Sequence, residues 1–228
     1  MSDFETVSYL LFSKAFLTFQ SVRNLCLIGC GHDALGLCAS LFENLVDLRY
    51  IRQAPKRRAR RFVQFEQVDK YYQVLKVLGR KRLPKGKRKQ YKGYLKNLAP
   101  QTAKLLKKFS KQRNGWVGKN LRDRAKAVKL DLEYDELYFI FCGLKHTLPA
   151  GAASIVIENA GGFDVIRGPS MKVVYQAALH ATQYLFRLMD QFQDIYALNA
   201  SGFRLRPLMQ RFIQSSQEFE RRHPELCS

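Results

Sequence analysis

The chain has 228 residues, of which 46% are hydrophobic, and a formal net charge of +20. This length suits one domain with one substantial core, and the hydrophobic fraction excludes a chain that is disordered throughout. We therefore expect a single domain over residues 1–228 whose charge serves a particular partner.

The N-terminal segment predicts a helix that runs to about Leu27. Ser2 and Glu5 have the S-x-x-E spacing of a capping box, and apolar residues then recur at helical intervals. The acids near the start do not fit a secretory signal, and glycines and polar residues interrupt the most apolar stretch, Leu25 to Phe42. We expect a cytoplasmic protein without a membrane span.

The five cysteines are an odd number and lie mostly inside apolar segments, which indicates reduced thiols. A possible metal cluster has the spacing C-x3-C-x-H-x5-C and consists of Cys26, Cys30, His32 and Cys38. Zinc fingers and ribbons do not have this spacing. The sequence therefore predicts buried thiols, no metal site and no cofactor.

A second helix is expected after Asp33 and ends before Pro55. Apolar residues cover more than half of its circumference, so the helix should be central, and Glu43 stands out on it. A buried carboxylate needs a partner. Glu43 either forms an acid/base pair with His146 or accepts a structural hydrogen bond from a tyrosine or histidine.

A third helix should begin at Pro55, with an apolar stripe along it and arginines largely elsewhere. Glycine, proline and many basic residues then predict an exposed, mobile loop or insertion at about residues 79–94. Further helices are expected at 100–112, 120–129, 131–146, 170–198 and 206–222, with a loop or short hairpin at 158–170. The predicted fold is all-α, a single-domain bundle of about seven helices with an exposed basic helix-loop segment.

The charge is concentrated in one segment. Residues 52–113 contain 22 basic and two acidic residues, whereas the rest of the chain holds 17 of each sign. Such segregation favours a surface that binds a polyanion, because lysine and arginine neutralise phosphates and release counterions. The predicted nucleic-acid-binding residues are Arg57, Arg58, Arg60, Arg61, Arg80, Lys81, Arg82, Lys85, Lys87, Arg88, Lys89 and Lys92. Interleaved aromatic residues that could stack on bases are Tyr71, Tyr72, Tyr91, Tyr94 and Phe109.

Three segments, ASLFENLVDLRYI, NGWVGKNLRDRAKAVKL and YDELYFIFCGLKH, resemble a bacterial family of uncharacterised helical proteins over residues 31–150. The family pattern is an R-S-x-x-E helix, W-x-G, and Y-x-x-x-Y followed by serine and histidine. The matching residues are Ser40, Glu43, Trp116, Gly118, Tyr134, Tyr138 and His146. The chain departs from the pattern at the arginine, replaced by Ala39, and at the serine, where Cys142 or Gly143 stands. The resemblance implies that the five residues Glu43, Trp116, Tyr134, Tyr138 and His146 converge on one interior pocket.

Two functions follow from these patterns. The first is a nucleic-acid-associated protein that uses a basic face at residues 52–113, with RNA, DNA or a ribonucleoprotein as its partner. The alternative is a phosphodiester hydrolase or other small enzyme of the kind found in bacterial defence or toxin systems. Its catalytic residues would be Glu43, His146 and Tyr138, with Trp116 and Tyr134 lining the pocket.

Overall fold

The computed structural model describes residues 1–80, 82–109, 115–146, 149, 153, 155–159, 161–165, 169, 171, 173–197 and 205–224. These residues form two compact units, one of Met1–Val7 with Ile51–Asn120 and one of Ser8–Tyr50 with Leu121–Ser228. The single domain expected from the sequence stays a prediction, since two compact units can belong to one domain. No helix among the described residues is long and apolar enough to cross a membrane.

The fold is helical, as predicted, and nine α-helices lie within the described ranges. The predicted helix at 131–146 is one helical run of α6 (Asp131–Glu133), a π-helix (Tyr134–Tyr138) and α7 (Phe139–Lys145). Partly because one predicted helix is divided in this way, the observed number of α-helices exceeds the predicted number of about seven. Of the two alternatives predicted for 158–170, a loop or a short hairpin, the structure has a hairpin that starts earlier: β1 (Val156–Asn159) pairs antiparallel with β2 (Gly162–Val165).

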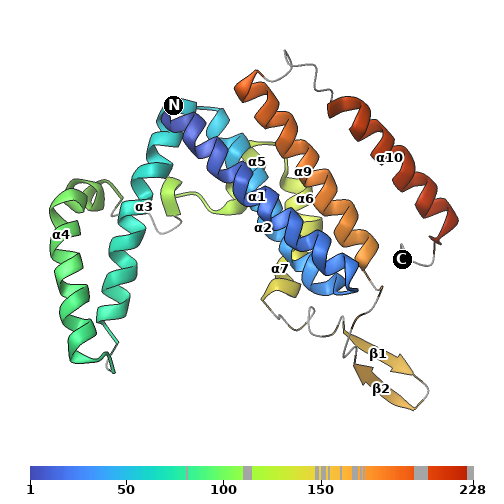
Figure 1. Ribbon diagram of the computed structural model, residues 1–228, viewed down its shortest axis with the longest axis horizontal. Helices are drawn as coiled ribbons and strands as arrows, with labels where there is room; N and C mark the ends of the chain where they lie inside the picture. Colours follow the sequence, from blue (N-terminus) through green and yellow to red (C-terminus); the bar gives the residue numbers. More distant parts are fainter. Residues whose placement is uncertain are drawn as a thin grey trace. The chain divides into compact units, whose positions relative to one another are not determined.

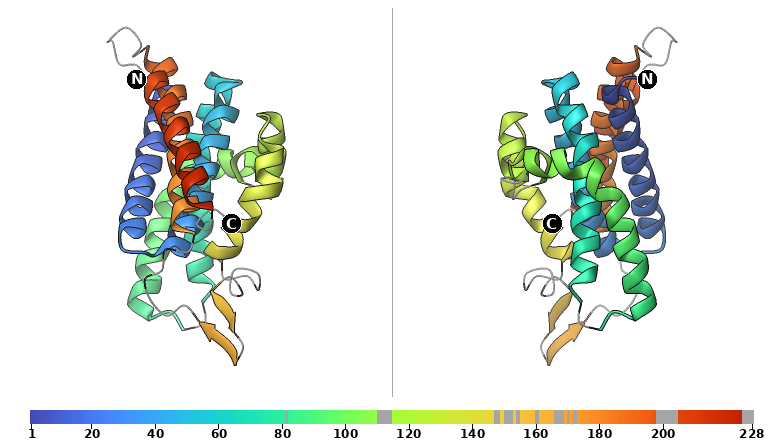
Figure 2. Two further views of the ribbon diagram at one scale, coloured as in Figure 1. Left: turned by 90° about the vertical axis from the view of Figure 1, so that its right-hand side faces the viewer. Right: turned by 90° about the vertical axis from the view of Figure 1, so that its left-hand side faces the viewer.

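The first unit contains an antiparallel pair of long helices, α3 (Pro55–Leu78) and α4 (Lys85–Phe109), which lie side by side (Figures 1 and 2). Trp116, in a short 3₁₀ helix (Gly115–Val117), packs edge-on against Phe62 at a centroid distance of 5.2 Å. Its carbonyl accepts a 2.7 Å hydrogen bond from Arg61. The contact between Trp116 and Phe62 thus holds the 3₁₀ helix against α3.

The predicted loop at 79–94 is wrong for most of its length, because α4 begins at Lys85 and continues through Pro100. Arg88, in the first turn of α4, contacts the end of α3: its guanidinium donates to the carbonyls of Leu78 and Arg80 at 3.2 and 3.1 Å. It thereby satisfies carbonyls that would otherwise lack partners at the end of α3. The connection between the helices is therefore short.

The second unit is built around α2 (Gly31–Arg52), most of whose apolar side chains are fully buried. α1 (Asp3–Leu27), whose residues from Ser8 onward belong to this unit, begins with the predicted capping box: the Ser2 amide donates to Glu5 at 2.6 Å and the Glu5 amide to Ser2 at 3.3 Å. α5 (Leu121–Ala127) precedes α6. Ser170, the predicted start of the next helix, lies outside the described residues, and α9 runs from Val174 to Tyr196.

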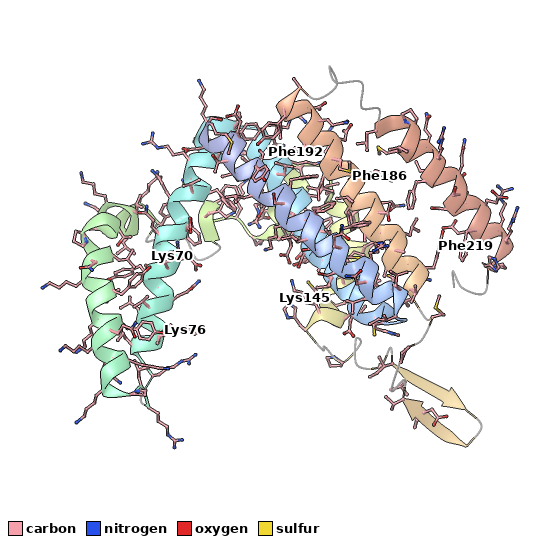
Figure 3. All side chains as sticks on the ribbon, in the orientation of Figure 1. Lys70, Lys76, Lys145, Phe186, Phe192 and Phe219 are labelled. Atoms are coloured by element: carbon pink, nitrogen blue, oxygen red, sulfur yellow. The ribbon has the colours of Figure 1, made fainter. Side chains whose placement is uncertain are left out.

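Aromatic pairs join α9 to its neighbours within the second unit. α10 (Leu205–Arg222) runs antiparallel to α9 (Figure 1), with Phe186 against Phe212 and Tyr175 stacked on Phe219 at 4.6 Å. On the other side Phe192 stacks on Phe12 of α1 at 4.4 Å; Phe186, Phe192 and Phe219 are labelled in Figure 3. The three α9 residues of these pairs are half-buried, whereas its fully buried apolar residues are others, among them Ala177, Ala181 and Leu188.

Candidate functional site

Polar side chains of α2 and the π-helix–α7 segment meet around Glu43. The Tyr138 hydroxyl donates to Glu43 Oε1 at 2.8 Å, and Lys145 Nζ lies 3.7 Å from the same oxygen. Lys145 Nζ also donates to Ser40 Oγ at 3.3 Å. Ser40 and Glu43 are three residues apart and therefore lie on one face of α2. We call Ser40, Glu43, Tyr138 and Lys145 the Glu43 cluster.

Aromatic packing holds Tyr138 in place. Its ring stacks on Tyr134 at 5.0 Å and lies 5.3 Å from Phe42, which is fully buried. Burial raises the pKa of the Tyr138 phenol far above its ordinary value, and hydrogen bonding to Cys142 and the nearby Glu43 carboxylate raise that pKa further. Tyr138 is therefore a neutral hydrogen-bond donor at physiological pH.

Gly36 allows α7 to approach α2 closely enough to form this cluster. A Cβ atom at Gly36 would lie 3.2 Å from the backbone nitrogen and 3.4 Å from the Cα of Lys145. Because these are backbone atoms rather than the end of a flexible side chain, α7 would have to move. The glycine stands one turn before Ser40 and two turns before Glu43 on the same face of α2.

We expect Gly36→Ala to weaken the Glu43 cluster without unfolding the protein. The added methyl group would gain helix propensity of about 1 kcal/mol but would force α7 outward at an overpacking cost of about 1–3 kcal/mol. Urea denaturation should show a net loss of unfolding free energy. Spectroscopy of the tyrosine hydroxyl groups should show a longer hydrogen bond between Tyr138 and Glu43. Gly86→Ala is the matched control, because a Cβ there meets nothing within 4 Å. A stabilised Gly36→Ala would contradict the close approach.

A second charged pair lies one turn further along α2. Arg124 Nε of α5 is 2.8 Å from Asp47 Oδ1, with 13% and 17% of the two side chains exposed. Burial raises the pKa of Asp47 to about 6, and the Glu43 carboxylate also raises it, whereas Arg124 opposes the shift. Asp47 is thus ionised at neutral pH chiefly because Arg124 stands beside it.

The structure brings only some of the predicted pocket residues together. Tyr138 donates to Glu43, so the structural hydrogen bond from a tyrosine is present, and Tyr134 stacks on Tyr138. His146 follows the last residue of α7 and is exposed, and the partners that the described residues give Glu43 are Tyr138 and Lys145. Trp116 belongs to the first unit, where it packs on Phe62. The catalytic roles of Glu43, His146 and Tyr138 stay predictions.

Sequence reasoning missed Lys145 and the Asp47–Arg124 pair. Asp47 had a signal, since it follows Glu43 by four residues in the same apolar helix, so the two carboxylates share one face. Lys145 was overlooked because the acid/base hypothesis paired Glu43 with the next residue, His146. Arg124 had no distinguishing signal among the many basic residues.

The cysteine-rich segment contains a buried thiol. Burial raises the pKa of Cys38 to about 12, and its Sγ lies 3.6 Å from the carbonyl oxygen of Ala177. Within the part of the chain that the structure describes, no three side chains of histidine, cysteine, aspartate or glutamate gather as metal ligands would.

The predicted nucleic-acid-binding residues divide into two groups. Arg61 and Arg88 donate to backbone carbonyls, and Arg58 donates to Gln53 at 2.8 Å, so these three have structural contacts. Lys81 lies outside the described residues. The remaining residues are exposed: Arg57, Arg60, Arg80, Arg82, Lys85, Lys87, Lys89 and Lys92.

Both acidic residues of the basic segment already have partners on α3. Glu66 Oε1 accepts from Lys70 at 2.5 Å, and Asp69 Oδ2 accepts from the Gln73 amide at 2.6 Å. Each pair has the i, i+4 spacing that places side chains one above the other. The two acids therefore orient neighbours on their own helix.

These features define a helical protein with a half-buried carboxylate–tyrosine cluster in one unit and a basic helical pair in the other. The sequence matches the family of unknown function DUF5677 over residues 5–163, and the chain belongs to this family. No curated protein and no solved structure matches the chain.

Proposed function

We propose that this protein binds nucleic acid through the exposed basic residues of α3, α4 and the turn between them. The segregation of charge supports this proposal: the whole excess of +20 falls within residues 52–113. A protein that needed charge only for solubility could distribute it over its entire surface. Concentrated positive charge attracts a polyanion and releases its condensed counterions.

The geometry of α4 supports a linear polyanion. Lys85, Lys89, Lys92 and Lys96 recur at intervals of four, three and four residues, so they follow one face of the helix, and all four are exposed. At 1.5 Å per residue this lysine stripe is about 16 Å long, which corresponds to roughly five nucleotide steps along a duplex. We define these four residues as the α4 lysine stripe.

We expect the α4 lysine stripe to determine the salt dependence of binding. Changing its four lysines to glutamine keeps good helix formers but removes the charges that neutralise phosphates. The measurement is fluorescence anisotropy across a salt series. The slope of log affinity against log salt should become shallower by about 0.9 for each phosphate that is no longer neutralised on duplex DNA, or by about 0.7 on single strands.

The matched control removes the same charge from the other unit by changing Arg23, Lys126, Arg211 and Arg221 to glutamine; all four are exposed. This variant should keep the wild-type slope. The proposal fails if wild-type protein binds with no salt dependence, or if both four-site variants change the slope equally. The hydrolase alternative stays a prediction that rests on Glu43 and His146.

A further inference from the structure

A groove of about 250 Å³ lies between α3 and α4 near the turn that joins them. Its α3 side consists of Lys70, Gln73, Val74 and Val77, and its α4 side of Tyr91 and Tyr94. The groove is accessible from solvent: 47% of Tyr94 and 51% of the Lys70 side chain are exposed. Figure 3 labels Lys70 on the middle of α3, with Lys76 closer to the turn.

The groove combines three chemistries in one place. Val74, Val77 and the tyrosine rings supply apolar and aromatic surface, whereas Lys70 and Gln73 supply hydrogen-bond donors and an amide acceptor. Glu66 and Asp69 orient these two polar side chains. A planar heterocycle with polar edges fits this lining better than a purely apolar group does.

The charge around the groove narrows the choice of occupant. The exposed basic residues Arg80, Arg82, Lys87 and Lys92 lie in the adjoining turn and in the first two turns of α4. A partner that carries both planar heterocycles and regularly spaced phosphates complements both features. Duplexes hide the faces of their bases in the stack, whereas unpaired bases are free to stack on protein aromatic rings.

We propose that this groove receives the base of an unpaired nucleotide, so that the protein prefers single-stranded nucleic acid. The inference rests on the proposed function, because exposed basic residues beside the groove hold the phosphate chain: Lys87, one turn before Tyr91 on the same face of α4, and Arg80 and Arg82 in the adjoining turn. Tyr91 and Tyr94 stack on the base, and the Gln73 amide contacts its polar edge. The site adds an aromatic contribution to affinity that phosphate contacts alone do not supply.

The test uses oligonucleotides that separate bases from phosphates. The probes are a short oligothymidylate, an oligouridylate of the same length, an abasic strand of equal phosphate number, and a duplex. Wild-type protein should bind the single strands more tightly than the abasic strand, and the thymidylate and uridylate probes distinguish DNA from RNA. The double variant Tyr91→Leu/Tyr94→Leu should lose roughly five- to 150-fold in affinity for the single strands and little for the abasic strand.

Matched variants isolate the stacking. Tyr94→Phe should retain the affinity, since the ring remains. Tyr9→Leu removes a similarly exposed tyrosine, 53% exposed, from the other unit; it should bind as wild-type does. If the double variant loses helix content by circular dichroism, Tyr94→Leu alone replaces it.

Two results would contradict base binding in the groove while leaving the proposed function intact. Equal affinity of wild-type protein for the abasic and thymidylate strands would show that only the phosphates are bound. A change of oligomeric state in the tyrosine variants, measured by sedimentation, would show that a second copy of the chain covers the groove. If wild-type protein bound none of these polyanions, in contrast, the proposed function itself would be wrong.

Discussion

Replacing Arg124 with methionine is expected to lower the free energy of unfolding at neutral pH by about 3–5 kcal/mol, because the variant leaves a carboxylate buried without its counter-charge. Asp47 and Arg124 lie 2.8 Å apart, and most of both side chains is withdrawn from solvent. The Glu43 carboxylate, one turn away, repels the same charge. Urea denaturation with linear extrapolation measures the loss.

The pH dependence identifies the cause. The folded pKa of Asp47, about 6, lies above its unfolded value near 3.8, so the native state binds the proton more tightly. The contribution of Asp47 to stability is therefore greatest below the unfolded value and falls as pH rises through 6, by at most about 3 kcal/mol. Without Arg124 this loss should extend to higher pH.

The double variant Asp47→Asn/Arg124→Met is the control. It removes both charges at similar volume, so it should recover most of the stability lost by Arg124→Met and lose this pH dependence. A single variant Arg124→Met as stable as the wild type at pH 8 would mean that Asp47 is solvated and that the pair contributes little.

The second large effect is expected at Phe42, where alanine should cost about 3–5 kcal/mol. Phe42 is fully buried and packs on Tyr138 at 5.3 Å, on Tyr134 at 6.4 Å and edge-on against Tyr184 at 5.8 Å. Its removal leaves a cavity beneath both Tyr134 and Tyr138. Thermal and urea denaturation should report the loss, and the Tyr138 phenol should titrate closer to its ordinary range as water enters.

The control for Phe42 is Phe139, also near these tyrosines in sequence but 65% exposed. Phe139→Ala should change stability by no more than about 0.5 kcal/mol, as surface substitutions usually do. Equal losses in the two variants would contradict the assignment of Phe42 to the core around Tyr138.

Local signals in the sequence predicted several element boundaries well. The capping box at Ser2 and Glu5 and the proline at the first turn of α3 specify helix starts through short-range contacts, and both are confirmed. The burial of α2 followed from its composition, since residues with apolar side chains cover most of its surface. These features depend on neighbours within a few positions of the chain.

The start of α4 could not be found in this way. Gly86 and Gly93 each disfavour a helix by about 1 kcal/mol relative to alanine, and the dense positive charge hid the underlying pattern. A helical pattern of partly or fully buried residues nevertheless continues through the segment, and we call it the α4 seam. Its members recur at alternating intervals of three and four: Arg88, Tyr91, Leu95, Leu98, Thr102, Leu105 and Phe109. Packing of this seam against α3, with Phe109 5.5 Å from Phe65, outweighs the local preference.

The Glu43 cluster was predicted in part. The tyrosine partner followed from the rule that a carboxylate on an apolar helix needs a hydrogen bond. The choice of Lys145 over His146 depends on where α7 ends and on how closely Gly36 lets it approach, and neither is visible without the backbone. The Tyr91–Tyr94 groove likewise required the pairing of α3 with α4.

The order of segments along the chain has a consequence for how the protein folds. The 70 residues Ile51–Asn120 interrupt the second unit, so its two parts come together only when a loop of this length closes. Relative to a connection of about seven residues, closing this loop costs roughly 2 kcal/mol more in chain entropy. The α3–α4 pair needs only the short connection from Gly79 to Pro84, and local contacts form sooner than distant ones. We therefore expect the basic helical pair to form before α2 and α5 come together, and its compaction to shorten the loop that must then be closed.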